Sequence, residues 1–145
     1  MRKWRLPLSY PPKIEPVMKG ECTQTIRVRN INKKTGKQAP KKEVGDLLQF
    51  FRWSGRPYWT HPVTITDYFP LIRVIDIRIY PEGIDLPICG TFFTWDSKIC
   101  YELACLDYIV PCSGEELGRV LQEKNKLPKN GIEGQILRWE TRLHL

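Results

Sequence analysis

The stretch LIRVIDIRIY at residues 71–80 decides how this chain folds. Ile75, Ile77 and Ile79 share one face of an extended segment, and the side chains between them are charged. A period of two residues is typical of a β-strand that has one face in a core and the other in water. The sequence therefore predicts a long strand here and a sheet to which other segments pair.

Other segments with the same period, or with a short apolar run between turn residues, predict further strands. These are residues 4–10, 24–29, 47–53, 63–66 and 135–143. Residues 81–90 contain two prolines and two glycines, so we expect a connection there. Residues 30–42 are polar and carry five lysines, so we expect a long exposed loop.

The C-terminal half also contains two segments that favour helices. Residues 97–107 and 114–124 place apolar side chains three to four positions apart, which is the period of a helix face. The second segment follows Ser113 and carries Glu116 at the spacing of a capping box. A shorter helix is expected over residues 14–19.

This order of elements indicates an α+β protein that is mainly β. The 145 residues suit a single domain over residues 1–145, and 41% hydrophobic residues argue against disorder. Sequential strands of this length leave exposed edges unless the sheet closes. We therefore expect a small mixed β-barrel with two or three short flanking helices.

The charge of the chain is unevenly spread. Residues 1–60 hold 14 lysines and arginines against 4 aspartates and glutamates, a net charge of +10, whereas residues 61–145 hold 9 against 12, a net charge of −3. Such an asymmetry favours a polyanionic partner, most often a nucleic acid. The alternative is a solvated basic surface that serves solubility.

The cysteines and the first residues indicate the compartment. The chain starts without an apolar stretch of signal-peptide length, and no segment reaches the roughly 20 apolar residues of a membrane helix. Five cysteines are an odd number, which together with this start favours free thiols in the cytoplasm and no membrane contact. With only His61 and His144 available and no Cys-x-x-Cys spacing, we expect no metal and no cofactor.

Residues 20–27, GECTQTIR, resemble the start of an ASCH domain, a member of the PUA-like superfamily. The usual form of that block is Gly-x-Lys-Thr-x-Thr-x-Arg, entered from a short helix. Weaker matches follow in the expected order at residues 44–46, 102–108, 113–117 and 136–139. The resemblance covers about residues 13–140 and implies a PUA-like barrel of five or six strands with a basic cleft suited to RNA.

The resemblance also implies candidate site residues. Some ASCH proteins hydrolyse N(4)-acetylcytidine with a lysine, a threonine and a glutamate. By position, the threonine corresponds to Thr25, the family's arginine to Arg27, the acidic residue to Asp107 and the lysine to Cys22. A cysteine does not supply the positive charge of the lysine, so this departure favours binding over hydrolysis.

The residues around this motif have functional and structural interpretations. Thr25, Arg27 and Arg29 share one face of the predicted strand, where arginines can hold phosphate or a base edge or can simply be solvated. Cys22 is a nucleophile only if a cation such as Lys19 lowers the pKa of its thiol, and the alternative is an inert, half-buried thiol.

Aromatic side chains accompany arginines further along the chain. Trp53, Tyr58 and Trp59 lie close in sequence to Arg52 and Arg56. Aromatic rings interleaved with arginines can stack on unpaired bases. The alternative is that the rings belong to the core.

We therefore predict that the protein binds RNA or a modified nucleoside in a cleft lined by Thr25, Arg27 and Asp107, with Cys22 at its mouth. Nucleic-acid contacts are assigned to Arg27, Arg29, Arg52, Arg56 and Lys19. A first alternative is an amidohydrolase that acts on an acylated nucleobase such as N(4)-acetylcytidine, with Thr25, Asp107 and Cys22 as catalytic candidates. A second alternative is a protein-interaction module whose basic face meets an acidic partner. The oligomeric state stays open.

Overall fold

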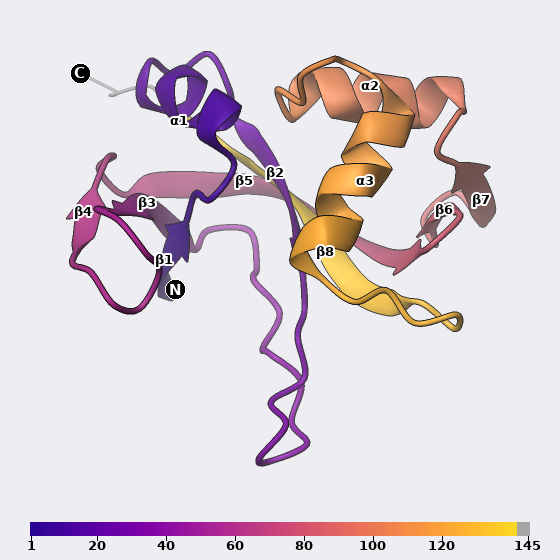
Figure 1. The fold of residues 1–145 in the computed structure, drawn as a ribbon, viewed down its shortest axis with the longest axis horizontal. Helices are drawn as coiled ribbons and strands as arrows, with labels where there is room; N and C mark the ends of the chain where they lie inside the picture. Colours follow the sequence, from indigo (N-terminus) through magenta and orange to yellow (C-terminus); the bar gives the residue numbers. More distant parts are fainter. Residues whose placement is uncertain (142–145) are drawn as a thin grey trace.

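The computed structural model describes residues 1–141 and has the α+β, mainly β architecture that the sequence predicts (Figure 1). Within these residues the elements follow in the order β1 (Lys3–Pro7), α1 (Pro11–Met18), β2 (Gln24–Val28), β3 (Leu47–Trp53), β4 (Pro62–Thr64), β5 (Phe69–Tyr80), β6 (Gly83–Leu86), β7 (Thr91–Thr94), α2 (Lys98–Leu106), α3 (Gly114–Lys124) and β8 (Ile132–Trp139). The end of the strand predicted over 135–143, and His144, lie outside the described residues.

Strand β5 connects the two halves of the sheet. Its first residues pair with β3, and the rest pairs with β8 on one side and, toward the end, with β6 on the other. β3 also pairs with β1 and β4, β6 pairs with β7, and β8 pairs with β2. The alternating stretch at residues 71–80 is thus the strand on which the rest of the sheet depends.

The predicted closed barrel is wrong, because the described sheet is open. β5 is 12 residues long and shifts register between Leu71 and Arg73, so the strands at its two ends diverge in Figure 1 and do not surround one axis. The edge strands β1, β2, β4 and β7 have only 5, 5, 3 and 4 residues. Short edges limit unwanted pairing, which removes the need for closure.

Both faces of β8 are buried over its second half. On β8, Ile136 belongs to a cluster under α2 and α3, whereas Leu137 and Trp139 belong to a cluster that α1 covers. The Trp139 and Phe50 rings pack in the second cluster with their centroids 4.8 Å apart. Alternate residues of β8 therefore pack into two separate cores, one on each face of the strand.

The segment 81–90 contains a strand that the sequence analysis missed. Ile84 and Leu86 are buried in β6, and the turn that follows ends at Gly90, whose φ is +63°. Gly83 has no room for a side chain, because a Cβ there would lie 2.1 Å from the carbonyl oxygen of Phe93. The prolines and glycines do mark turns and close packing. The alternating residues of β6 lie between them, and this pattern is too short to predict a strand.

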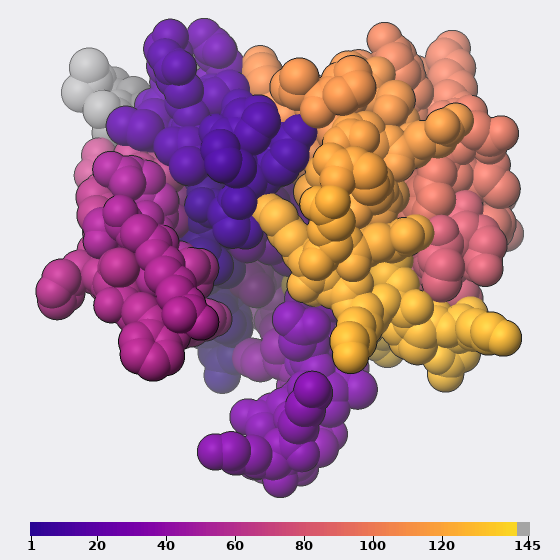
Figure 2. All heavy atoms as spheres, viewed as in Figure 1, coloured from indigo at the N-terminus to yellow at the C-terminus, as the bar shows by residue number. Residues whose placement is uncertain are grey.

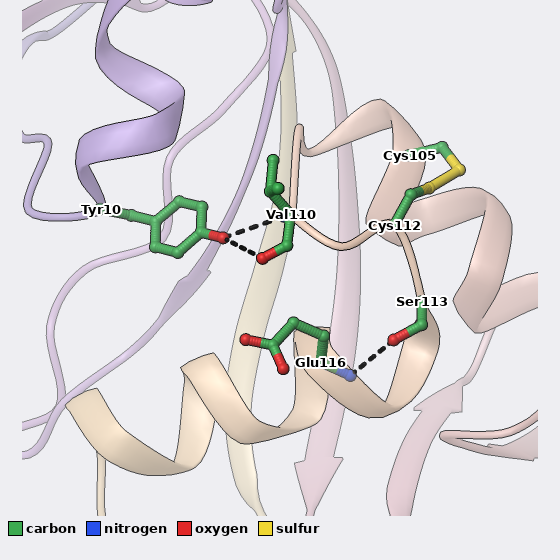
Figure 3. Close-up of a disulfide and its surroundings, with 6 residues drawn as sticks. All are labelled: Tyr10, Cys105, Val110, Cys112, Ser113 and Glu116. Atoms are coloured by element: carbon green, nitrogen blue, oxygen red, sulfur yellow. Dashed lines mark hydrogen bonds between the residues drawn. A yellow bond between two sulfur atoms is a disulfide. The ribbon is translucent and has the colours of Figure 1, made fainter.

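The helix ends agree with the sequence. The hydroxyl of Ser97 accepts a hydrogen bond from the backbone N–H of Cys100, and that of Ser113 accepts one from Glu116 (Figure 3). After α1 the chain reverses at Gly20, whose φ of +76° lies in the left-handed region that glycine tolerates. No helix among residues 1–141 is long and apolar enough to cross a membrane.

The cationic segment between β2 and β3 is the exposed loop that the sequence predicts. It projects from the body of the molecule in Figure 1 and is held by a bridge between Ile31 and Gln38. At its base, the Lys42 ammonium lies 4.6 Å from the ring centroid of Trp4. The loop begins where β2 ends, which is also where the candidate site lies.

Candidate functional site

A pocket of about 230 Å³ lies between the N-terminal segment, β2, the connection after α2, and α3. In Figure 2 the N-terminal segment (indigo) and α3 (orange) are neighbours on one face of the molecule. The polar lining consists of Ser9, Tyr10, Lys13, Thr25, Arg27, Asn30, Asp107, Lys124 and Asn125. The apolar lining includes Leu8, Val28, Ile109, Leu117 and Leu121.

Strand β2 brings two of the predicted residues to this pocket. Thr25 and Arg27 line it together with Ile26 and Val28, and Ile26 also belongs to the core under α2 and α3. The guanidinium Nε of Arg27 donates to Oγ1 of Thr25 at 3.2 Å. Burial lowers the pKa of Arg27 to about 10, although the nearby Asp107 carboxylate acts in the opposite direction. Arg27 therefore stays a cation at neutral pH.

Asp107 reaches the pocket from the end of α2, where its residue forms the C-cap. Its Oδ2 pairs with the Nζ of Lys13 at 3.0 Å, and the two residues are only 5% and 3% exposed. Burial raises the pKa of Asp107, and the charges of Lys13 and Arg27 oppose that shift. The pair thus lies in a largely dehydrated environment.

The other carboxylate oxygen of Asp107 has no partner. Its Oδ1 is buried, and no group within residues 1–141 donates a hydrogen bond to it. A buried acceptor without a donor costs free energy in the empty protein. Because Asp107 lines the pocket, an N–H or O–H group of a ligand bound there is a candidate donor for this oxygen.

Lys13 is the site residue that the sequence analysis missed. It lies on α1 four positions before Val17, and these are the two buried residues of that helix. The spacing of four residues was the available signal, because it places both side chains on one helix face. A lysine on the buried face of a helix needs a partner of opposite charge.

Lys124, at the end of α3, adds a further cation at the rim of the pocket. Its ammonium lies 5.5 Å from the ring centroid of Tyr10. Partial desolvation of the ammonium and the positive charges of Arg27 and Lys13 lower the pKa of Lys124 to about 8. Three cations thus meet one carboxylate in this pocket, which favours an electron-rich or anionic ligand.

The prediction that Cys22 lies at the mouth of the pocket is wrong. Cys22 is fully buried in the cluster under α1, and its thiol points to the carbonyl oxygens of Gln24 and Leu106 at 3.4 and 3.8 Å. Burial raises the pKa of the Cys22 thiol, with a smaller opposing effect of Lys13. The neutral thiol is the form that this environment favours.

The other arginines and the lysine assigned to nucleic acid do not line the pocket. Arg29 pairs with Glu133 and donates to the carbonyl oxygen of Ala39. Lys19 pairs with Glu15 on the exposed side of α1. Arg52 and Arg56 lie on the hairpin formed by β3 and β4, away from α3 in Figure 1.

The expectation of five free thiols is wrong for one pair, because Cys105 and Cys112 form a disulfide (Figure 3). The backbone turns at Tyr108, whose φ is +54°, and brings the two Cα atoms to 5.3 Å, a normal disulfide distance. Such a turn is not visible in the spacing of seven residues. The bridge encloses the segment that carries Asp107.

The N-terminal segment also contacts the segment that the disulfide between Cys105 and Cys112 encloses. The hydroxyl of Tyr10 accepts a hydrogen bond from the N–H of Val110 at 2.9 Å and donates one to its carbonyl oxygen at 3.1 Å (Figure 3). Together with the disulfide and the Lys13 ion pair, these bonds position Asp107 from three directions.

No family model matches this chain, and neither the curated proteins nor the solved structures contain a significant match. Among the described residues, no group of three or more histidine, cysteine, aspartate or glutamate side chains is arranged to hold a metal ion. The site therefore has to be interpreted from its own geometry and charge.

Proposed function

We propose that the protein binds RNA or a modified nucleoside, with one nucleobase in the pocket formed by β2, α1 and α3. The observation that carries the proposal is the unpartnered Asp107 Oδ1 beside the cations of Lys13, Arg27 and Lys124. Nucleobase edges combine N–H donors with carbonyl or ring-nitrogen acceptors, so they complement a carboxylate flanked by cations. The resemblance of residues 20–27 to the start of an ASCH domain also supports this proposal.

The size of the pocket agrees with a single base. Pockets for drug-sized ligands usually measure about 300–1,000 Å³, and this one measures about 230 Å³. The apolar lining, with Leu8, Ile109 and Leu117, offers contact to a planar ring. The lysine-rich loop begins beside the pocket at Asn30, where it can follow the phosphates of a longer strand.

Replacing Arg27 by alanine tests this function. We expect the affinity for a short RNA to fall about tenfold, because a charge-assisted hydrogen bond contributes about 1.5–3 kcal/mol. The dependence of log affinity on log salt should become shallower by about 0.7 if Arg27 contacts one phosphate. Fluorescence anisotropy over a salt series measures both quantities.

The matched control is Arg73→Ala, which removes an exposed arginine of β5 that does not line the pocket. It should bind like the natural sequence. No RNA binding at low salt, or equal losses in both variants, contradicts the proposal. Binding of an acidic protein instead of RNA identifies the interaction-module alternative.

The pKa of Lys124 leads us to expect that ligand binding depends on pH. The lowered pKa of about 8 means that the ammonium loses its charge as the pH rises through that value. Affinity for a mononucleotide, which cannot extend along the lysine-rich loop, should therefore decline between about pH 7 and pH 9, and Lys124→Arg should abolish the decline because arginine stays charged. The control is Lys42→Arg, since Lys42 also has a pKa lowered to about 8 but does not line the pocket. A decline that persists in Lys124→Arg contradicts the assignment.

The second candidate function is an amidohydrolase, and Lys13 is the observation that favours it. Its ammonium supplies, from α1, the positive charge that Cys22 lacks, in the same pocket as Thr25 and Asp107. In that reaction Oγ1 of Thr25 would attack the acyl carbon, the nucleobase amine would leave with a proton, and water would release the acid. Because Lys13 is paired with Asp107, it can stabilise an oxyanion but is not a free base.

An assay with N(4)-acetylcytidine separates the two candidates. We expect weak or absent turnover by the natural sequence, because the Thr25 hydroxyl contacts the Arg27 guanidinium, which cannot accept its proton, and Asp107 is paired with Lys13. Turnover that disappears in both Thr25→Ala and Lys13→Gln would instead establish the hydrolase. Turnover that disappears only in Cys22→Ala would assign a cysteine nucleophile.

A further inference from the structure

A second set of aromatic and cationic side chains lies on the outer face of the β3–β4 hairpin. The rings of Phe51, Trp53 and Tyr58 follow one another in what we term the aromatic ladder. The Phe51 and Trp53 centroids are 5.3 Å apart and the Trp53 and Tyr58 centroids are 5.0 Å apart. Phe51 and Trp53 share a strand face because they are two residues apart.

The ladder runs from the half-buried rings of Phe51 and Trp53 to an exposed ring, where a core residue would be buried. Tyr58 is 87% exposed, and its neighbour Trp59 is 77% exposed. Tyr58 also has a φ of +65°, a left-handed conformation that is costly for a bulky residue. Such strain is found most often at functional sites, and here it holds the ring beside Trp53.

Cations accompany these rings. The Arg5 guanidinium lies 5.0 Å from the ring centroid of Phe51, and that of Arg56 lies 5.1 Å from that of Trp59. Residues 47–66 contain no aspartate or glutamate. The hairpin therefore presents flat apolar rings and positive charge together, which complements a partner with flat rings and negative charge.

We propose that this outer face is a stacking surface for the unpaired bases of a single-stranded nucleic acid, used in addition to the pocket. Bases would stack on Tyr58 and Trp59, while Arg56 and Arg5, the cations beside these rings, contact the phosphates. The proposal rests on the proposed function, because it assigns a longer strand, rather than a free nucleoside, as the natural ligand. None of these four residues lines the pocket.

The surface and the pocket are separate parts of the molecule. Figure 1 shows β3 and β4 at one end of the sheet, whereas α3 lies beside β8 in the other half. A mononucleoside can occupy the pocket but cannot reach both places, whereas a strand of several nucleotides can. Binding of mononucleosides and of oligonucleotides therefore reports on the two sites separately.

The test uses the full chain with Tyr58→Asn, Trp59→Leu and the double variant. Asparagine tolerates the positive φ at position 58 and removes the ring, and leucine keeps an apolar side chain but removes the aromatic surface. We expect each single variant to lose about tenfold in affinity for a single-stranded oligonucleotide of about eight nucleotides. The affinity for a mononucleoside should not change.

The matched control is Tyr101→Asn, which removes a half-exposed tyrosine from α2. It should leave both affinities unchanged. Tryptophan fluorescence adds a direct readout, because a base stacked on Trp59 should quench emission in the natural sequence and quench it less in Trp59→Leu. RNA and DNA versions of one oligonucleotide should both show the ring dependence, since stacking does not require the 2′-hydroxyl.

The outcomes separate this inference from the pocket function. Ring-dependent oligonucleotide binding without mononucleoside binding supports the surface and refutes the pocket. Mononucleoside binding together with oligonucleotide affinity that survives the double variant refutes the surface and keeps the pocket. Ring-dependent binding to vesicles of anionic phospholipid without binding of any oligonucleotide also refutes the surface, and assigns it to a membrane.

Discussion

Lys13→Met is expected to lower the free energy of unfolding by about 3–5 kcal/mol, which is the usual cost of removing one partner from a buried ion pair. The loss should be this large because Lys13 is the partner of Asp107 at 3.0 Å, and the second oxygen of that carboxylate already lacks a donor. Methionine keeps the length and volume of the side chain, so the change is mainly one of charge. Urea denaturation followed by circular dichroism measures the loss.

The matched control is Lys19→Met on the same helix. Lys19 pairs with Glu15 at 2.9 Å, but both side chains are largely exposed. Exposed pairs of this spacing contribute about 0.3–0.5 kcal/mol. Equal losses in Lys13→Met and Lys19→Met would show that the Lys13–Asp107 pair is not buried in solution.

The stability loss in Lys13→Met should depend on pH, because it depends on the protonation of Asp107. Burial raises the pKa of this carboxyl above its ordinary value of 3.8, so the folded state binds the proton more tightly than the unfolded chain. The contribution of Asp107 to stability is therefore fully present below about pH 3.8 and is lost as the pH rises through the folded pKa. The difference in the free energy of unfolding between Lys13→Met and the natural sequence should therefore be smallest in acid, where Asp107 is protonated and needs no cation. A deficit that grows in acid would contradict this sign.

Removing the disulfide with Cys105→Ser and Cys112→Ser is expected to destabilise the protein by about 2–3 kcal/mol. The two cysteines are seven residues apart, and closing a loop of that length in the unfolded chain has an entropic effect of this size. Because Asp107 lies inside the closed segment, the affinity for a nucleoside should fall as well. Urea denaturation and ligand titration measure the two effects.

Cys89→Ser is the control, since Cys89 is an exposed free cysteine. It should change the free energy of unfolding by less than about 0.5 kcal/mol. A thiol reductant should lower the stability of the natural sequence toward that of the double variant and leave the double variant unchanged. A natural protein that is indifferent to the reductant and matches the double variant would show that Cys105 and Cys112 are not joined.

The local patterns of the sequence determined most of the elements. Alternation predicted β5 and β2, and a serine three residues before Glu116 predicted the start of α3, because these signals depend only on neighbours along the chain. Turn residues had the opposite effect at Ile84, where prolines and glycines on both sides concealed β6. The placement of Thr25 and Arg27 on one strand face is a local property of the same kind.

The tertiary structure alone decided how the site is assembled. Lys13 and Asp107 come from distant parts of the chain, as do Tyr10 and Val110, which are 100 positions apart. No period or motif records which helix packs against which strand, so the pairing of charges across that distance follows only from the packing of α1 beside the end of α2. The open sheet has the same origin, because the register shift in β5 depends on partners at both of its ends. The sequence by itself determined that a basic, mainly β chain presents Thr25 and Arg27 together, and packing decided that the cation beside them is Lys13 while Cys22 lies in the core.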